Sequence, residues 1–537
     1  MADGQLPDTQ ERRLTRDQFL RRAAAAGAVA LVSGCGGSSQ TQTQKGSAPR
    51  RGGTLRFGGA GGSSKDYMDP GVSFSDVDAA RDQATFEPLA GTDAGGNVVL
   101  NSLAEEFSST TPDVWTIRVR DGIEFHNGKT LGADDVIYSI QRMANPKVGL
   151  AAAAQLASID PSRMTKLDRR TVRLVLKQKD VTILPTLSSP WTGIVPVGYS
   201  PHRAGGASVA EQIGTGAYML KSYTPGQQSV HVRFPHYWRT TYLDELVITD
   251  LTDTARVNAL LGGQVDAATQ IPSVQAKQVA GSGAAHLLVS PSQTFGPLLM
   301  QVKTAPFNDV RVRQAMRLLA NRPQMVALAL GGYGRVGNDV PSPFDPAYDA
   351  ALPQRQQDIQ QAQSLLKAAG HQGLTVTLVT AAVLQGLTQA STVFAENAKA
   401  AGVKVNVNVI DSSTLYGPRY LKWPFSVDYY SGEGYLQQVA VWGLPTSPYN
   451  ETGWPDAQHA SYVSLYKEAR STLDPTKRTE IIHAMQQIEH DAGGAIIWGF
   501  VDHTDGYGTK VNGLHGAQRT PYPMNNYGQG FRSLWLS

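Results

Sequence analysis

The chain lacks several features that would point to particular classes of protein. It has one cysteine, Cys35, in 537 residues, so an internal disulfide is impossible and structural zinc sites built on cysteine are excluded. No apolar run reaches the roughly 18 residues that a membrane-spanning helix needs. The basic residues are scattered and the net charge is only +3, which argues against a nucleic-acid-binding face.

Motifs of catalysis are missing as well. Neither Gly-x-Ser-x-Gly nor His-Glu-x-x-His occurs. Residues 122–130 come close to a phosphate-binding loop, but the glycine spacing is one residue too long and the pattern is that of a hairpin. His231 and His236 lie five apart on an alternating strand and so face opposite sides. We expect that the protein is not an enzyme, that it holds no cofactor and that it binds no metal ion directly.

The composition that is present is that of an ordinary folded protein. Hydrophobic residues make up 41% of the chain and charged residues 17%, which is close to globular usage. The length suggests two to four domains, or lobes built from several segments of the chain.

The first fifty residues have the pattern of an export signal. Several arginines open the chain, an apolar stretch covers residues 23–32, and Ser33-Gly34-Cys35 follows. This order predicts a signal peptide over residues 1–34. The tetrad ending in Cys35 resembles a bacterial lipobox, which implies lipidation of Cys35 and a flexible tether over residues 35–50. An ordinary signal peptide with an incidental cysteine is the alternative.

These signals predict a protein that works outside the cytoplasm. It would be anchored to the outer face of the cell membrane, or periplasmic, without spanning the bilayer. Residues 15–20 also resemble a twin-arginine signal in which Asp17 replaces the second arginine. The general secretory and twin-arginine routes therefore both remain open.

Apolar spacing in the rest of the chain predicts a mixture of strands and helices. Residues 115–119 alternate as a half-buried strand, and Asp134 opens a helix. Two Asx-Gly dipeptides bracket a short strand at 123–125. A strand at 374–379, a helix at 389–401 and a strand at 403–409 form a parallel β–α–β unit. Asp474 caps a helix whose first residue is a proline.

Ten segments, in this order along the chain, resemble the family 5 extracellular solute-binding proteins, which serve importers of dipeptides, oligopeptides, nickel and opines. One of them is the Gly214-Thr215-Gly216 turn with the two residues that follow it. The segments are residues 52–56, 68–70, 103–105, 115–128, 133–139, 214–218, 235–238, 259–266, 306–315 and 474–478. Most of these motifs shape turns and core positions, so they indicate the fold more than the ligand.

The resemblance implies an α/β fold of the periplasmic-binding-protein type, class II: a two-lobed clamshell with an extra small domain. Lobe I would comprise residues 51–88, 205–293 and 505–537, the small accessory domain residues 89–204, and lobe II residues 294–504. Ligand would bind in the cleft between the lobes, which close by hinge motion. The permease subunits of an ABC importer would then recognise the closed state.

The resemblance also directs attention to one strand of lobe II, predicted at 425–430. In peptide-binding members a Trp-x-x-Asp-Tyr-like stretch follows this strand, and its aspartate pairs with the amino terminus of the peptide. Here Ser431-Gly432-Glu433-Gly434-Tyr435 follows, and Asp428-Tyr429 falls inside the predicted strand. Glu433 is the candidate acceptor for a cation, and a solvated turn residue is the alternative.

Aromatic side chains in unusual settings are the other candidates for the ligand site, because rings give large contact areas at small entropic cost. They are Trp191, Phe295, Tyr435, Trp442 and Trp498. Packing in a core is the alternative for each.

The sequence therefore predicts a monomeric solute-binding lipoprotein that captures a peptide or peptide-like solute for an ABC importer. A receptor for an opine, a sugar or a metal chelate on the same fold is the alternative. A secreted lipoprotein hydrolase or an adhesin is less favoured.

Overall fold

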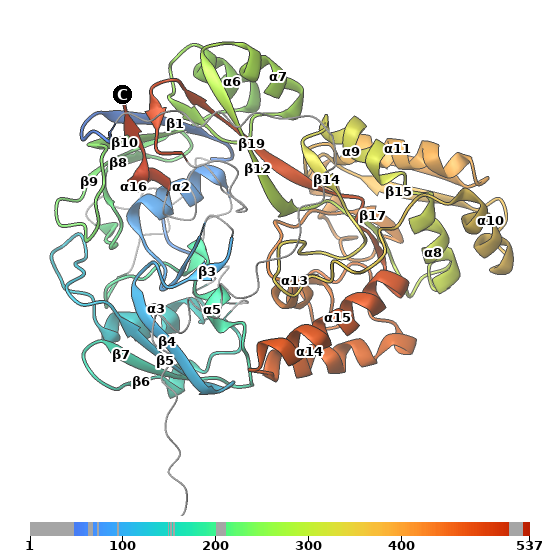
Figure 1. Cartoon of the computed structure of the whole chain (residues 1–537), viewed down its shortest axis with the longest axis horizontal. Coiled ribbons are helices and arrows are strands. Elements are labelled where there is room, and N and C mark those ends of the chain that lie inside the picture. Colours follow the sequence, from blue (N-terminus) through green and yellow to red (C-terminus); the bar gives the residue numbers. More distant parts are fainter. Residues whose placement is uncertain are drawn as a thin grey trace, which may run out of the picture. The chain divides into compact units, whose positions relative to one another are not determined.

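Two large sheets and a smaller one carry most of the strands in the computed structural model of the chain (Figure 1). The structure describes residues 48–62, 68–71, 75–93, 96–145, 147–148, 150, 153, 156–199, 211–514 and 530–537. All of them belong to one unit, Gly46–Ser537. The predicted signal peptide, Cys35 and all but the last three residues of the predicted tether lie outside the described residues.

The first large sheet combines segments from both ends of the chain and from its middle. Its strands, in sheet order, are β12 (Ala285–Thr294), β19 (Gly499–Gly508), β11 (Ala267–Ala268), β1 (Thr54–Gly59), β10 (Glu245–Asp250), β9 (Gln228–Arg233) and β8 (Tyr218–Thr224), with β14 (Gly334–Val336) paired to β19. β1 runs parallel to both of its neighbours, and the other pairs are antiparallel. Leu55 and Phe57 of β1 are fully buried in its core.

Helices α2 (Asp76–Thr85), α6 (Asp253–Leu261) and α7 (Ser273–Gly281) pack against this sheet. The Gly214-Thr215-Gly216 turn lies against the end of α2. A Cβ atom at Gly214 would lie 1.9 Å from the carbonyl oxygen of Thr85, so no larger residue fits there. This close approach explains a motif that the sequence shows only as two glycines.

The second large sheet has the order β16 (Lys404–Val409), β15 (Thr375–Thr380), β17 (Phe425–Val427), β13 (Leu298–Met300) and β18 (Ala495–Ile496). β15 and β16 are parallel, and α11 (Leu387–Lys399) connects them, so the predicted β–α–β unit is confirmed. Helices α8 (Val310–Leu319), α9 (Arg322–Leu330) and α10 (Ile359–Ala368) contribute to the same core. The predicted strand 425–430 ends three residues early, at Val427.

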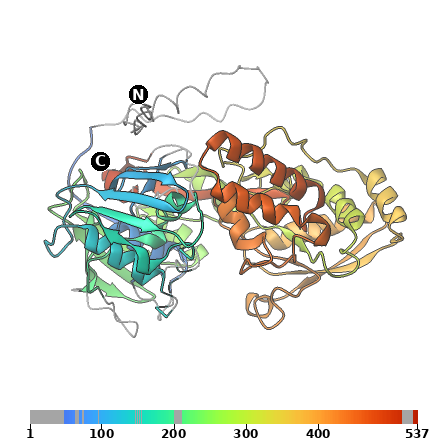
Figure 2. The same ribbon diagram turned by 90° about the horizontal axis from the view of Figure 1, so that it is seen from below.

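The remaining helices of this half are α13 (Tyr435–Trp442), α14 (Ser461–Ser471) and α15 (Pro475–Ala492). α14 and α15 lie side by side in both ribbon views (Figures 1 and 2). The predicted start of α15 is confirmed, because the Asp474 carboxylate accepts hydrogen bonds from the backbone N–H groups of Thr476 and Lys477. None of the described helices is long and apolar enough to cross a membrane.

A four-stranded antiparallel sheet forms a separate core. Its order is β4 (Ala104–Thr111), β5 (Val114–Val119), β7 (Thr171–Val175) and β6 (Thr165–Lys166), and α3 (Ala133–Met143) packs against β6 and β7. Trp115, Ile117 and Val119 of β5 are buried, as their alternation predicts. The predicted strand at 123–125 is reduced to one bridge, between Glu124 and Thr130, because the two glycine turns leave too few residues between them.

The chain passes between the two large sheets through β12 and β19. These strands pair antiparallel from Ala285 opposite Gly508 to Thr294 opposite Val501, with a register shift on the way. β12 leads into β13, and β18 leads back into β19. Phe295, directly after β12, forms an isolated bridge with Tyr430.

A buried carboxylate ties α8 and α9 to the strand connection after β18. Both oxygens of Asp339 lie 2.7 Å from Nη2 of Arg322, and one lies 2.8 Å from Nε of Arg355. The Arg317 guanidinium is 4.0 Å away, and the backbone N–H of Ile497 also donates to Asp339. Burial alone would raise the pKa of Asp339, but the guanidinium groups outweigh burial and lower it.

Candidate ligand-binding site

Two of the predicted site residues meet in one aromatic cluster beside the second large sheet. The ring centroid of Phe295 lies 5.3 Å from that of Tyr430, 5.5 Å from that of Trp442 and 5.9 Å from that of Phe500. Phe295 and Trp442 are both buried. The structure therefore brings Phe295 and Trp442 together, in a packed cluster rather than on an open surface.

Trp498 and Tyr435 are also buried, and each has its polar atom satisfied. The indole N–H of Trp498 donates to the carbonyl oxygen of Gly296 at 2.6 Å, next to the aromatic cluster. The Tyr435 hydroxyl donates to Glu489 at 2.8 Å, in the core formed by α13, α14 and α15. Both side chains have the contacts of core residues.

Glu433 and Trp191 lie apart from the aromatic cluster. Glu433 is half-buried in the loop before α13, where the Ser342 hydroxyl donates to its carbonyl oxygen at 2.6 Å. Burial raises the pKa of the Glu433 carboxyl. Trp191, in a short 3₁₀ helix (Pro190–Thr192), is half-buried against the core of the four-stranded sheet.

The early end of β17 changes the interpretation of Asp428-Tyr429. The predicted strand placed this pair inside the strand, but β17 stops at Val427, so the pair follows it directly. The Asp428 carboxylate accepts a hydrogen bond from the backbone N–H of Tyr429 at 2.7 Å. This side-chain bond to the backbone replaces the ladder at that point and ends the strand. An Asp-Tyr pair therefore does follow the strand.

Asp428 is the centre of a cluster that the sequence analysis missed. The hydroxyl groups of Tyr416 and Tyr420 donate to its two oxygens at 2.7 and 2.8 Å, and the two rings are 5.1 Å apart. The Tyr430 hydroxyl donates to the neighbouring carboxyl of Glu451 at 3.2 Å. Asp428 and Glu451 are only 4% and 6% exposed. We call these five residues the tyrosine–carboxyl cluster.

The pKa of one carboxyl group of this cluster, that of Glu451, is strongly raised. Burial, the hydrogen bond to Asp428 and repulsion from Asp428 raise the pKa of Glu451 well above its usual range, which favours the protonated form of this carboxyl. No lysine, arginine or histidine among the described residues forms an ion pair with either carboxyl. Within the described part of the chain, the cluster thus buries two carboxyl groups without an ion-paired cation.

Partly exposed tyrosines adjoin these carboxyl groups. Tyr429 and Tyr449 are each 47% exposed and Tyr416 is 39% exposed, while Tyr420 is half-buried. The faces of tyrosine rings attract cations, most strongly where water is excluded. The arrangement suits an organic cation, with rings for its apolar part and a carboxylate for its charge.

A signal for this cluster was present in the sequence, although only in part. Six tyrosines fall within residues 416–449, an unusual density for a chain with 20 in all. The pairing of Asp428 with Glu451 could not be read from spacing, because it depends on where β17 ends and on the loop that returns Glu451 to it.

Comparison with known proteins agrees with this architecture. Residues 99–448 match the family model described as "Bacterial extracellular solute-binding proteins, family 5 Middle". Di/tripeptide-binding protein 1 of Pseudomonas aeruginosa is 24% identical over 506 residues, which covers 84% of this chain and 89% of that protein.

Two solved structures share the fold. The structure of AgaA of A. tumefaciens R10 in complex with agropinic acid has a TM-score of 0.72 and 21% identity, and covers 90% of this chain and 99% of that chain. The structure of DppA from Helicobacter pylori in complex with peptide STSA has a TM-score of 0.72 and 18% identity, and covers 91% of this chain and 98% of that chain.

The chain belongs to family 5 of the bacterial extracellular solute-binding proteins. It has the two-lobed α/β fold of the family and is a solute-binding protein of the kind that serves ABC importers. The family consists of extracytoplasmic binding proteins, not enzymes.

Proposed function

We propose that the protein captures a peptide or peptide-like solute through a cationic amine. The observation that carries this proposal is the tyrosine–carboxyl cluster, in which two buried carboxyl groups meet and no described cation forms an ion pair with either. An ammonium group placed there forms a charge-assisted hydrogen bond in a poorly solvated setting. The names of the relative from P. aeruginosa and of the H. pylori complex support a peptide as the solute.

Protonation of Glu451, which its raised pKa favours, would match the charge of the cluster to that of one ammonium group. Two ionised carboxylates in contact would repel each other and would bind a single ammonium with one charge left over. A protonated Glu451 leaves one charge for one cation and holds Asp428 in place. Phe295 and Trp442 pack against Tyr430 and support it from behind. Glu433 is proposed as a secondary acidic group, and Trp498, whose indole N–H donates to Gly296, as a further support of the wall.

A non-peptide solute that carries an amine is the second candidate. The AgaA structure contains agropinic acid, so the same fold accommodates a solute that is not a peptide. Because the cluster recognises the charge and not the peptide bond, opines and amine-bearing chelates compete with peptides for it.

A thermal-shift screen of the purified chain against di- to pentapeptides, opines, sugars and metal chelates tests this function. A solute at a hundredfold excess over its dissociation constant should add about 2.7 kcal/mol to the free energy of unfolding. We expect shifts with solutes that carry a free amine. Stabilisation by neutral sugars alone would contradict the proposal.

We further propose a division of the chain into two lobes and an accessory domain. Lobe I comprises residues 51–88, 205–293 and 505–537, the accessory domain comprises residues 89–204, and lobe II comprises residues 294–504. The two lobes would close on the solute by a hinge motion in β12 and β19. The closed monomer would then dock on the permease subunits of an ABC importer.

Lipidation of Cys35 would hold the protein at the outer face of the membrane after removal of residues 1–34. We expect Cys35→Ser to move the protein from the membrane fraction to the soluble extracytoplasmic fraction, because one thiol carries the anchor. Fractionation followed by immunoblotting measures this. A variant that stays in the membrane fraction to the same extent as the original chain would show that Cys35 is not the anchor.

A further inference from the structure

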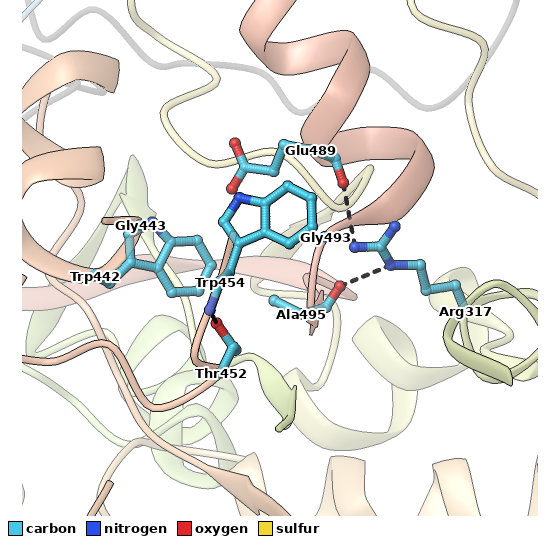
Figure 3. A pocket seen from close by; sticks show the side chains of 9 residues that line it. Arg317, Trp442, Gly443, Thr452, Trp454, Glu489, Gly493 and Ala495 are labelled. Atoms are coloured by element: carbon cyan, nitrogen blue, oxygen red, sulfur yellow. Dashed lines mark hydrogen bonds between the residues drawn. The ribbon is translucent and has the colours of Figure 1, made fainter. Parts of the chain in front are cut away.

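A small pocket lies between α8, α13, α15 and the loop that follows α13 (Figure 3). Its wall includes Arg317, Trp442, Thr452, Trp454, Glu489 and Gly493. Gly493 lets the backbone come close, since a Cβ atom there would lie 2.8 Å from Nη2 of Arg317. The pocket is next to the aromatic cluster, because the rings of Trp442 and Tyr430 are 5.0 Å apart.

Two indole groups in this wall lack a hydrogen-bond acceptor. Trp442 and Trp454 are 4% and 3% exposed, and neither Nε1–H has a partner among the described residues. By contrast, the other indoles with described bonds donate to nearby oxygens: Trp115 to Pro112, Trp238 to Glu87, Trp423 to Leu415 and Trp498 to Gly296. A buried donor without an acceptor costs roughly 1–3 kcal/mol, so two in one pocket call for an acceptor there.

The charges behind the pocket favour an acceptor that is negative. Three guanidinium groups, those of Arg317, Arg322 and Arg355, gather around one carboxylate, Asp339. Glu489 is the other carboxyl near Arg317, and its Oε2 accepts hydrogen bonds from Tyr435 and Tyr462 at 2.8 and 3.3 Å. The Arg313–Asp456 ion pair lies in the same region. Even with Glu489 ionised, four guanidinium groups therefore face three carboxyl groups among the described residues here.

We propose that this pocket binds a small monovalent anion, which accepts hydrogen bonds from the indole N–H groups of Trp442 and Trp454 under the positive field of Arg317. The anion is either a free halide or the carboxylate of a bound solute. Both are singly charged acceptors that an indole N–H donor can hold. Figure 3 shows the two indoles in the pocket wall with the Glu489 carboxyl near Trp454.

Binding of the anion is coupled to the protonation of Glu489. Burial raises the pKa of Glu489 to about 7, and the negative charge of Asp339 adds to this rise. The hydrogen bonds from Tyr435 and Tyr462 and the positive charge of Arg317 lower the pKa, but by less. His490, next in the helix, is neutral at pH 7 because burial lowers its pKa. An anion repels the ionised form of Glu489, so it binds more tightly as pH falls through 7.

The test uses the complete chain with ¹⁵N-labelled tryptophan, which gives one indole signal from each of its eight tryptophans. Trp442→Phe and Trp454→Phe assign two of these signals. Sodium bromide and sodium formate, titrated separately at constant ionic strength, are the probes. We expect the Trp442 and Trp454 indole signals to shift downfield together and to saturate, while the Trp115, Trp423 and Trp498 signals stay in place.

The pH dependence separates a bound anion from a general salt effect. From pH 8 to pH 6 we expect the bromide affinity to rise by up to roughly tenfold, since a rise of one unit in the pKa of Glu489 is a factor of ten in the coupled binding constant. Glu489→Gln should bind bromide with an affinity that no longer depends on pH. If this variant fails to fold, the pH series on the unaltered chain still decides the coupling.

Saturable shifts with bromide would support a free halide as occupant. Shifts with formate alone would support the carboxylate of a solute. If neither probe moves the two signals, or if the control indoles move equally, the anion site is overturned. This outcome is independent of the proposed function, which the screen with amine-bearing solutes tests by itself.

Discussion

Loss of both carboxyl groups in the double variant Asp428→Asn/Glu451→Gln is expected to weaken the binding of a cationic solute by roughly a hundredfold. Removing the partner of a poorly solvated charge typically costs 2–5 kcal/mol, which corresponds to factors of this size. The amide groups keep the shape and can still bond to Tyr416, Tyr420 and Tyr430, so the fold should survive. Isothermal titration with a solute found in the thermal-shift screen measures the change.

The single variants should behave differently from the double variant. In Glu451→Gln the charge of Asp428 remains, so affinity should stay within a few fold of the original. In Asp428→Asn the repulsion and hydrogen bond that hold Glu451 protonated disappear, its pKa falls, and part of the charge returns. Tyr429→Phe is the control, because it keeps the aromatic ring and removes only the hydroxyl group of a side chain that is 47% exposed, so it should change the affinity little. Undiminished binding by the double variant would refute the assignment of the cluster.

Replacement of Asp339 by asparagine is expected to lower the free energy of unfolding by about 3–5 kcal/mol. The substitution leaves the buried guanidinium groups of Arg317 and Arg322 without their shared carboxylate. Urea unfolding at pH 7 measures the loss. Asp309→Asn is the control, because it keeps the cap of α8 and removes only a partly exposed ion pair with Arg311. Its effect should be within about 1 kcal/mol.

The same substitution should also change the acid limb of stability. The pKa of Asp339 is lower in the folded protein than its usual value. Ionised Asp339 therefore contributes fully to the free energy of unfolding above its usual pKa, and this contribution is lost as the pH falls through the pKa of the folded state. Asp339→Asn should lack this part of the pH dependence. If the variant is as stable as the Asp309→Asn control, the network does not hold α8 and α9 in the manner described.

Local sequence patterns predicted the elements of the fold well where the signal is short-range. The cap at Asp474, the alternation in β5 and the β–α–β unit from β15 to β16 all depend on neighbouring residues. The order of strands in the first sheet joins β1, β10 and β19 from distant parts of the chain. Only the resemblance to a family could suggest that arrangement, because spacing contains no information on long-range pairing.

The ligand site was harder to predict, for physical reasons that particular residues show. Tyr435 and Trp498 stand out in the sequence, but their polar atoms are satisfied inside the core. Asp428 looked unsuitable because β17 was predicted three residues too long, and the strand ends there through a side-chain bond to the backbone. Glu451 acquires its role only through tertiary contact with Asp428, which no local pattern records.

The most direct test of the central claim is isothermal titration with a peptide from the screen, beside the same peptide with an acetylated amino terminus. Acetylation removes the positive charge and leaves the rest of the molecule unchanged. We expect the free amine to bind and the acetylated form to bind roughly a hundredfold more weakly. Equal affinity for the two forms would contradict the claim that the tyrosine–carboxyl cluster captures a cationic solute.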